Sequence, residues 1–387
     1  MKRLFLGLLC CSSLFLSGCS WLDFSTDGKT EIEPAELVDF DEEVEIDKLW
    51  SSGGVGSIEG IGSNLLPALY EGKIYAADSD GNVIAVNTAN GKKLWDTELE
   101  ATLTGGVGAG YGSVFVGSAE GDIFALDAET GNLQWQASTS SEVLSAPASN
   151  GSIVAVQSQD AKLLGLNAAT GEQVWQFRID SPVLTLRGSS APLMVGSTVI
   201  AAFANGKIYG LSADSGTQLW ENRIAVPQGR TELERMVDID GQPLLEGDVL
   251  YVGSFQGRLT AVSRGTGRNL WFQDSSSHRG PAHGLGQVYM VEEGDTVRAF
   301  RASSGQVLWT NDQLLYRKLS APTVAGGYLA VADSEGYLHL LSQTDGHFVA
   351  RAKVDGSGVN APMVTDGERL YVLANDGSIT AYAFEKR

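Results

Sequence analysis

The sequence predicts an all-β chain that folds as an eight-bladed β-propeller, in which each blade is a four-stranded antiparallel sheet. The first observation is a repeated spacing: two glycines lie ten residues apart, and a tryptophan follows the second by four residues, as in Gly81, Gly91 and Trp95. The second is a proline fourteen residues before the first glycine, as in Pro67. The third is that no window shows a long apolar stripe at helical spacing, which excludes a helical repeat.

The repeat occurs eight times along the chain, so its copies define the blades. Four copies are complete: Gly81/Gly91/Trp95, Gly121/Gly131/Trp135, Gly206/Gly216/Trp220 and Gly257/Gly267/Trp271. Three copies depart at one position each: Ala161/Gly171/Trp175, Asp295/Gly305/Trp309 and Gly336/Gly346/Ala350. A last half-copy, at Gly377, runs into the C-terminus. Because self-similarity at this period outweighs chain length in judging domains, residues 44–387 are interpreted as one domain.

Each copy reads as four short strands. In the copy that runs from Pro192 to Trp220, the expected strands are residues 193–195, 199–203 and 208–211, with a fourth that begins at 217. The Asn-Gly and Ser-Gly pairs between them supply the positive φ that tight hairpins need, so the strands form a meander. A single meander cannot bury both of its faces. Radial stacking of such sheets around an axis solves this, and the result is a propeller.

The eighth copy lacks its fourth strand because the chain ends at Arg387. Residues 44–50 end in Leu49-Trp50, which matches the fourth-strand pattern, and they belong to no complete copy. We therefore expect this N-terminal strand to complete the last blade and close the ring. Seven of the eight tryptophans occupy the same repeat position, so we expect these large rings to pack at the seams between blades.

The N-terminus carries the pattern of a secretory signal. Residues 1–18 combine a short positive start with an apolar stretch that is too short to span a membrane. Residues 16–19, Leu-Ser-Gly-Cys, resemble the bacterial lipobox, in which the cysteine is acylated and becomes the mature N-terminus. We expect lipidation at Cys19, and Ser20 after it favours the outer membrane. The alternative is an ordinary signal peptide with a chance cysteine.

The composition limits the functions that the chain can have. Its formal net charge of −20 argues against nucleic acid or anionic lipid surfaces as partners. Cys10 and Cys11 would leave with the signal peptide, so no disulfide framework is expected in the mature chain. Residues 19–43 are rich in Asp, Glu, Ser and Thr and lack periodicity, which predicts a flexible acidic tether between the lipid and the ring.

The best enzyme hypothesis comes from the repeat, since residues 125–135 are similar to the repeat of pyrroloquinoline-quinone dehydrogenases. That resemblance would imply a quinone, a Ca²⁺ ion and a catalytic aspartate. However, the mature chain lacks the cysteine pair common in those enzymes and the long insertions that cover their active sites. His278 and His283 have no third ligand to form a zinc site, and the loop that starts at Asp78 lacks the final glutamate of a calcium loop. We expect no cofactor, no metal and no catalysis.

Two consecutive linkers between blades are long, and insertions in a repeat fold often carry function. Most linkers from the tryptophan position to the next proline span ten to thirteen residues, whereas residues 175–192 span seventeen and residues 220–243 span twenty-three. Residues 50–67 also span seventeen, but this Gly- and Ser-rich segment is interpreted as a connection. The first contains Leu184, Leu186 and Arg187, and the second contains Leu233, Arg235, Met236, Val237, Asp238 and Asp240. Apolar anchors ringed by charges suit a protein–protein contact. They could instead pack the two loops onto the ring.

These features together resemble the BamB (YfgL-type) family of lipoproteins. The resemblance covers essentially the whole chain and includes Leu-x-Leu-Arg-Gly-x-Ser-Ala-Pro at residues 184–192 and Thr-Glu-hydrophobic-x-Arg with Asp-x-Asp at residues 231–240. It implies a non-enzymatic scaffold of the outer-membrane β-barrel assembly machine, anchored by lipid on the periplasmic face. In this family the two loops bind the POTRA domains of the BamA insertase. That role would fall on Leu184, Leu186, Arg187, Arg235, Asp238 and Asp240.

The resemblance also implies contacts with the rest of the assembly complex and with unfolded outer-membrane proteins. One alternative is that exposed edge strands of the blades capture nascent barrel strands by β-augmentation. The other, least favoured alternative is a quinoprotein dehydrogenase.

Overall fold

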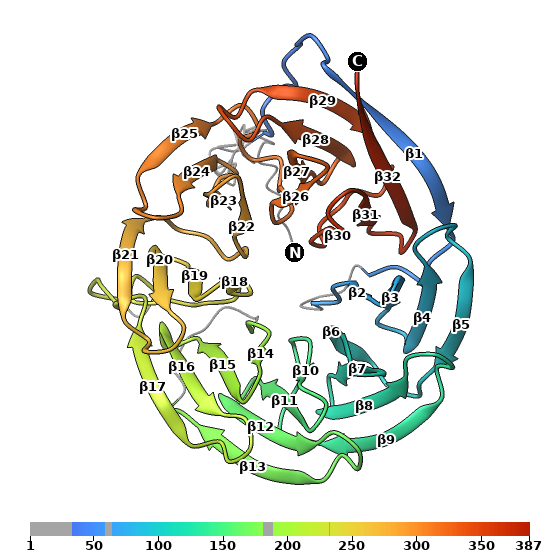
Figure 1. The fold of residues 1–387 in the computed structure, drawn as a ribbon, viewed down its shortest axis with the longest axis vertical. Coiled ribbons are helices and arrows are strands. Elements are labelled where there is room, and N and C mark those ends of the chain that lie inside the picture. Colours follow the sequence, from blue (N-terminus) through green and yellow to red (C-terminus); the bar gives the residue numbers. More distant parts are fainter. Residues whose placement is uncertain (1–32, 59–63, 181–188, 232) are drawn as a thin grey trace, which may run out of the picture. The chain divides into compact units, whose positions relative to one another are not determined.

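The computed structural model describes residues 33–58, 64–180, 189–231 and 233–387. Figure 1 shows that these residues form eight four-stranded antiparallel sheets, arranged radially around one axis. The predicted all-β, eight-bladed propeller is therefore confirmed. None of the described residues forms a helix that is long and apolar enough to cross a membrane.

In the first four blades, the strands follow one another in chain order from the axis to the outer edge. Blade 1 has β2 (Ala68–Tyr70), β3 (Lys73–Ala77), β4 (Asn82–Asn87) and β5 (Lys93–Glu98). Blade 2 has β6 (Leu103–Gly110), β7 (Ser113–Ser118), β8 (Asp122–Asp127) and β9 (Leu133–Ser138). Blade 3 has β10 (Ala148–Ser149), β11 (Ile153–Ser158), β12 (Lys162–Asn167) and β13 (Gln173–Arg178). Blade 4 has β14 (Leu193–Val195), β15 (Thr198–Phe203), β16 (Lys207–Ser212) and β17 (Gln218–Arg223).

The remaining blades repeat this order, and the last one borrows its outer strand. Blade 5 has β18 (Leu244–Glu246), β19 (Val249–Gly253), β20 (Arg258–Ser263) and β21 (Asn269–Asp274). Blade 6 has β22 (Ala282–Gly284), β23 (Gln287–Val291), β24 (Val297–Arg301) and β25 (Val307–Asn311). Blade 7 has β26 (Thr323–Ala325), β27 (Tyr328–Ala332), β28 (Tyr337–Leu341) and β29 (Phe348–Lys353). Blade 8 has β30 (Val364–Thr365), β31 (Leu370–Leu373), β32 (Ile379–Lys386) and, outermost, β1 (Val44–Ser52).

The N-terminal strand closes the ring, as the sequence predicts. β1 pairs antiparallel with β32, from Val44 opposite Lys386 to Ser52 opposite Ile379, with one bulge between Lys48 and Trp50. The two ends of the domain therefore meet in one sheet, and the blades cannot separate unless this pairing breaks.

The tryptophans pack at the seams between blades, as expected. The indole N–H of Trp95 in blade 1 donates to the carbonyl of Ala128 in blade 2 across 3.0 Å. Equivalent bonds join Trp135 to Ala168 (2.9 Å), Trp175 to Ala213 (2.6 Å), Trp271 to Ala302 (2.8 Å) and Trp309 to Gln343 (2.9 Å). A Cβ at Gly131 would lie 2.6 Å from the Trp95 ring, and Gly131 has a φ of 73°. The glycine and the tryptophan of one copy thus serve two different seams.

Ala350 replaces the tryptophan in blade 7, and ring closure explains why. Each seam tryptophan packs under the turn between the third and fourth strands of the next blade. Blade 8 has no such turn, because its third strand ends at the C-terminus and its fourth strand, β1, comes from the N-terminus. A tryptophan on blade 7 would therefore have no turn of the next blade to pack against. Ala350 is instead buried in a cluster that includes Val44 of β1.

The topology of each blade assigns its connections to one of two faces of the ring. In a four-stranded meander, the turn between strands two and three lies at the same end as the linker to the next blade. The other two turns lie at the other end. We call the first end the loop face, because it carries the two long linkers, and the second the opposite face. A bridge between Asp238 in the second long linker and Phe255 in a loop-face turn of blade 5 agrees with this assignment.

Residues 34–43, which precede β1, lie against the outer edge of blade 7, where Figure 1 shows them in blue outside β29. The amide of Ala35 donates to the carbonyl of Leu315 across 2.9 Å. Leu37 and Phe40 pack against the hydrophobic cluster of blades 6 and 7. The sequence places this stretch at the end of the acidic tether, and in the structure it is bound to the ring.

Candidate partner-binding loops

The structure describes only the ends of the first loop. Leu184, Leu186 and Arg187 lie outside the described residues, as does the predicted lipidation site Cys19. Beyond the loop, Ser190 is buried, and its hydroxyl donates to the carbonyl of Gly241, at the end of the second loop, across 3.3 Å. This contact joins the bases of the two loops on the loop face, as the prediction of two neighbouring loops requires.

The second loop folds into a compact turn that the sequence stabilises locally. Glu234 Oε2 accepts hydrogen bonds from the amides of Arg230 (2.6 Å) and Thr231 (3.2 Å). In return, the Thr231 hydroxyl accepts from the amide of Glu234 (3.2 Å). This reciprocal arrangement is a capping box, and these amide donors lower the pKa of the Glu234 carboxyl. The result is one capped turn, formed by residues 230–231 and 233–235, which we call the knob.

Blade 5 holds the knob in place. With its amide nitrogen turned toward the knob, Gln256 donates to the carbonyls of Glu234 (3.0 Å) and Met236 (3.2 Å). The amide of Phe255 donates to the carbonyl of Asp238 across 2.8 Å. Both residues lie in the turn between β19 and β20, whose Gln256 adopts a left-handed φ of 48°. The knob is therefore positioned by a rigid hairpin of the ring.

The loop separates its apolar residues into an outward and an inward set. Leu233 is 64% exposed and Val226 is 48% exposed, and Arg235, two positions after Leu233, is also exposed. Val237 is buried, and Ile239 is buried in the cluster between blades 4 and 5. The sequence singled out Leu233 and Arg235 but missed Val226. The sequence feature that could have identified Val226 is its position directly before Pro227 and just after Ile224 and Ala225, which are buried.

Asp238, which the sequence predicts as a partner contact, does not offer its carboxylate at the surface. The residue is 1% exposed, and its Oδ1 accepts a hydrogen bond from the amide of Ile239 across 2.8 Å. The carboxylate therefore stabilises the loop from within. Any effect of Asp238 on a partner would act through the shape of the loop.

Asp240 is mostly buried, and its Oδ1 has no hydrogen-bond partner among the described residues. Burial raises the pKa of Asp240 to about 6, and the nearby His278 partly offsets this rise. A buried carboxylate is costly in its ionised form unless a donor or a cation satisfies it. The second loop thus holds a buried carboxyl group whose ionised form is destabilised.

The two histidines considered for zinc have separate neighbours. His278 Nδ1 lies 2.8 Å from Glu293 Oε1, whereas His283 stacks on the ring of Tyr251. Within the described ranges, no group of three or more His, Cys, Asp or Glu side chains is arranged to hold a metal ion.

Comparison with known proteins gives one consistent result. A family model described as "Outer membrane protein assembly factor BamB" matches residues 31–102, 79–311 and 293–387. The chain is 50% identical over 371 residues to the outer membrane protein assembly factor BamB of Pseudomonas aeruginosa, with 96% of each chain covered. It is similar to the crystal structure of BamB from Moraxella catarrhalis, with a TM-score of 0.78 and 29% identity over 83% of this chain and 96% of that one.

The fold is also shared with enzymes. The quinohemoprotein alcohol dehydrogenase of Comamonas testosteroni matches with a TM-score of 0.65 and 14% identity, covering 87% of this chain and 76% of that one. At this identity the likeness concerns the propeller fold alone.

Proposed function

The chain belongs to the BamB family of outer-membrane protein assembly factors, and on this premise we propose that it is a lipid-anchored periplasmic scaffold that binds the POTRA domains of the BamA insertase. Family membership gives the protein a role in outer-membrane protein assembly and an association with the outer membrane. It also identifies the protein as an assembly factor and not an enzyme.

The observation that carries the proposal is the knob of the second loop. Its capping box and the Gln256 contacts fix the backbone before any partner arrives, while Leu233 stays 64% exposed. Binding through such a preformed turn avoids much of the entropy that a flexible loop would lose. Arginine is enriched among the residues that dominate binding energy, so Arg235 near the exposed Leu233 favours a contact here.

The first loop is proposed to extend this surface. The contact between Ser190 and Gly241 joins the bases of both loops, and this supports a shared partner for Leu184, Leu186 and Arg187 and for the knob. Asp240 is proposed to contact the partner through the exposed part of its side chain, because its Oδ1 is buried. Arg235 would contribute at the exposed rim, and Asp238 would hold the loop in shape.

Lipidation at Cys19 and a periplasmic location rest on the signal pattern of residues 1–19. In this proposal, the lipid keeps the ring at the membrane that contains the barrel insertase. Confinement to one surface raises the effective concentration of the loops around their partner.

The outer strands argue against capture of barrel strands at the blade edges. In blades 1 to 7, the pairing between the third and fourth strands contains a bulge just before the tryptophan position, such as that between Ala85 and Val86 opposite Leu94. A bulge leaves one residue unpaired and increases the local twist, which discourages the addition of another strand. We therefore assign partner binding to the loops.

Co-purification from solubilised outer membranes tests this assignment. Replacing residues 181–188 with a Gly-Ser segment of equal length should lower the recovery of BamA at least tenfold while the thermal melt stays unchanged. A control with the same replacement at residues 59–63, between β1 and β2 in the chain, should retain the partner. Full recovery of BamA with the first replacement would remove the first loop from the interface.

A further inference from the structure

Residues 34–43, which we call the clasp, connect the two faces of the ring. At one end, Ala35 is bound to Leu315 in the linker between blades 6 and 7, which lies on the loop face. At the other end, the Glu43 carboxylate lies 3.0 Å from Nε2 of His347, in the turn between β28 and β29. That turn joins the third and fourth strands of blade 7, so it lies on the opposite face. The clasp thus crosses the full outer edge of the ring.

Two arginines bind the clasp through hydrogen bonds to its backbone carbonyls. Arg317 donates from Nη1 to the carbonyl of Ala35 across 2.9 Å, and Arg351 donates from Nη1 to the carbonyl of Val38 across 2.8 Å. The guanidinium of Arg351 also lies 4.9 Å from the centre of the Phe40 ring, which packs against Phe348 at 5.4 Å. These contacts combine charge-assisted hydrogen bonds with cation–π and apolar packing.

A buried polar network holds both arginines in position. Arg317 is 3% exposed and donates from Nε to Asp333 Oδ2 across 2.7 Å and from Nη2 to Glu335. His339 Nε2 lies 3.0 Å from the same Asp333 oxygen, and Arg351 Nε donates to His339 Nδ1 across 3.1 Å. Burial lowers the pKa of His339, which favours the neutral ring that these contacts need. With its other two nitrogens held by Asp333 and Glu335, the guanidinium of Arg317 directs Nη1 toward the clasp.

The outer strand of blade 7 begins with apolar residues that the clasp buries. Phe348 and Val349 are buried, and the amide of Glu43 donates to the carbonyl of Val349 across 2.9 Å. The first two residues of the outer strands of blades 1 to 5 are exposed instead. The sequence therefore places apolar residues on this edge because the clasp covers it.

We propose that the clasp determines where the lipid-bearing N-terminal segment leaves the ring, and that it sets this point on the loop face instead of the opposite face. β1 begins at Val44 on the opposite face, beside the C-terminal Arg387, whose amide donates to the Glu43 carbonyl. Without the clasp, the tether would leave from there. With it, the tether leaves at Pro34, next to Leu315 on the loop face.

This inference rests on the proposed lipidation of Cys19 and on the proposed docking loops. The clasp starts the tether on the face that carries the loops, so the shortest path from the membrane to the ring leads to that face. It also shortens the free tether to residues 20–33, which reach at most about 50 Å when fully extended. Releasing the clasp would lengthen the tether by ten residues and start it on the wrong face.

Distances between spin labels in the full-length lipidated protein in detergent test the proposal. One nitroxide is attached in the tether through Thr30→Cys, and the second on the loop face through Asp312→Cys or on the opposite face through Thr344→Cys. With the clasp intact, the distance from position 30 to position 312 should be clearly shorter than that to position 344. Phe40→Ala and, separately, Arg351→Gln should broaden both distributions and remove or reverse this order.

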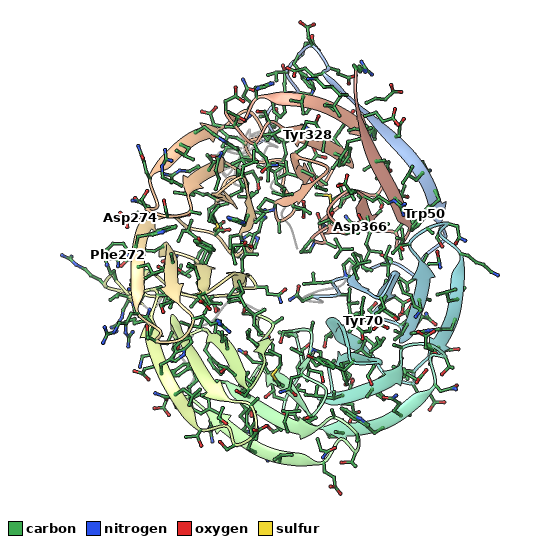
Figure 2. All side chains as sticks on the ribbon, in the orientation of Figure 1. Trp50, Tyr70, Phe272, Asp274, Tyr328 and Asp366 are labelled. Atoms are coloured by element: carbon green, nitrogen blue, oxygen red, sulfur yellow. The ribbon has the colours of Figure 1, made fainter. Side chains whose placement is uncertain are left out.

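Phe272→Ala is the matched control, because Figure 2 places Phe272 at the outer edge of the ring and its aromatic face lies 4.2 Å from the Arg258 guanidinium. It should leave the order of distances unchanged. A shorter or equal distance to position 344 in the intact protein would overturn the proposal, and so would an unchanged order in both clasp variants. Recovery of BamA in detergent depends on the loops alone, so it should not change in Phe40→Ala. A failure of the docking proposal would therefore appear in the BamA recovery and not in the spin-label distances.

Discussion

The indole N–H of Trp50 donates to the carbonyl of Thr88 across 2.9 Å, and this bond joins the strand that completes the last blade to the turn of the first. A Cβ at Gly91, in the same turn, would lie 2.5 Å from the Trp50 ring. Figure 2 labels Trp50 at the outer rim, where β1 meets blade 1. The ring is therefore closed twice, once by strand pairing within blade 8 and once by packing against blade 1.

Trp50→Ala should weaken this closure. The loss of a partly buried indole is expected to lower the free energy of unfolding by about 2–4 kcal/mol, measured by urea denaturation. Hydrogen exchange should rise in β1 specifically. Trp95→Ala removes an equivalent ring at a seam inside the continuous chain, so it should destabilise the fold without exposing the amides of β1. Unchanged exchange in β1 of Trp50→Ala would contradict the second closure.

The two copies that lack the first glycine should respond differently when it is restored. Ala161 and Asp295 keep the left-handed backbone there, with φ of 61° and 70°. Ala161→Gly should raise the free energy of unfolding by about 1 kcal/mol, because a left-handed conformation strains alanine but not glycine. Denaturation midpoints measure this change.

Asp295→Gly should instead destabilise the protein. The Asp295 carboxylate accepts hydrogen bonds from the amides of Lys318 (2.6 Å) and Leu319 (3.0 Å) and pairs with Arg279 Nη2 at 3.1 Å. Losing a buried partner of these donors should cost about 3 kcal/mol, which exceeds the relief of strain. Stabilisation by this substitution would show that backbone strain outweighs the polar contacts.

Asp240 should make stability depend on pH. Its pKa is raised to about 6 in the folded protein from 3.8, so the folded state holds a proton more tightly than the unfolded state. The free energy of unfolding should therefore fall as pH rises from about 4 to about 6, by on the order of 2 kcal/mol, and then level off. Asp240→Asn removes this dependence. The difference in the free energy of unfolding between the variant and the wild type should grow from pH 4 to pH 6. Parallel curves of this free energy from pH 4 to 7 would contradict the role of Asp240.

The sequence predicted the blades, their four strands and the closing strand because each of these depends on residues near one another in the chain. Turn glycines and short apolar runs carry that information locally. The missing tryptophan at Ala350 was visible in the sequence, but its cause was not. It follows from the meeting of β1 and β32, whose residues are more than 300 positions apart.

Long-range contacts also account for what the sequence could not show near the loops and the clasp. The acidic residues around Leu37 and Phe40 indicated a tether. The structure binds this segment to the ring through Arg317 and Arg351, which donate to carbonyls 282 and 313 positions earlier in the chain. Asp238 stood out as a charged residue of an insertion. Its burial depends on Phe255 in the adjacent hairpin, a contact that no local pattern encodes.

The affinity of the purified ring for isolated POTRA domains of BamA tests the docking of the loop face most directly. Leu233→Ser removes the exposed anchor of the knob, whereas Leu285→Ser removes a leucine that is 71% exposed in a turn of the opposite face. We predict that Leu233→Ser raises the Kd at least tenfold, about 1.4 kcal/mol of binding free energy, and that Leu285→Ser leaves it unchanged. Wild-type affinity in Leu233→Ser, or an equal loss in Leu285→Ser, would contradict docking through the knob.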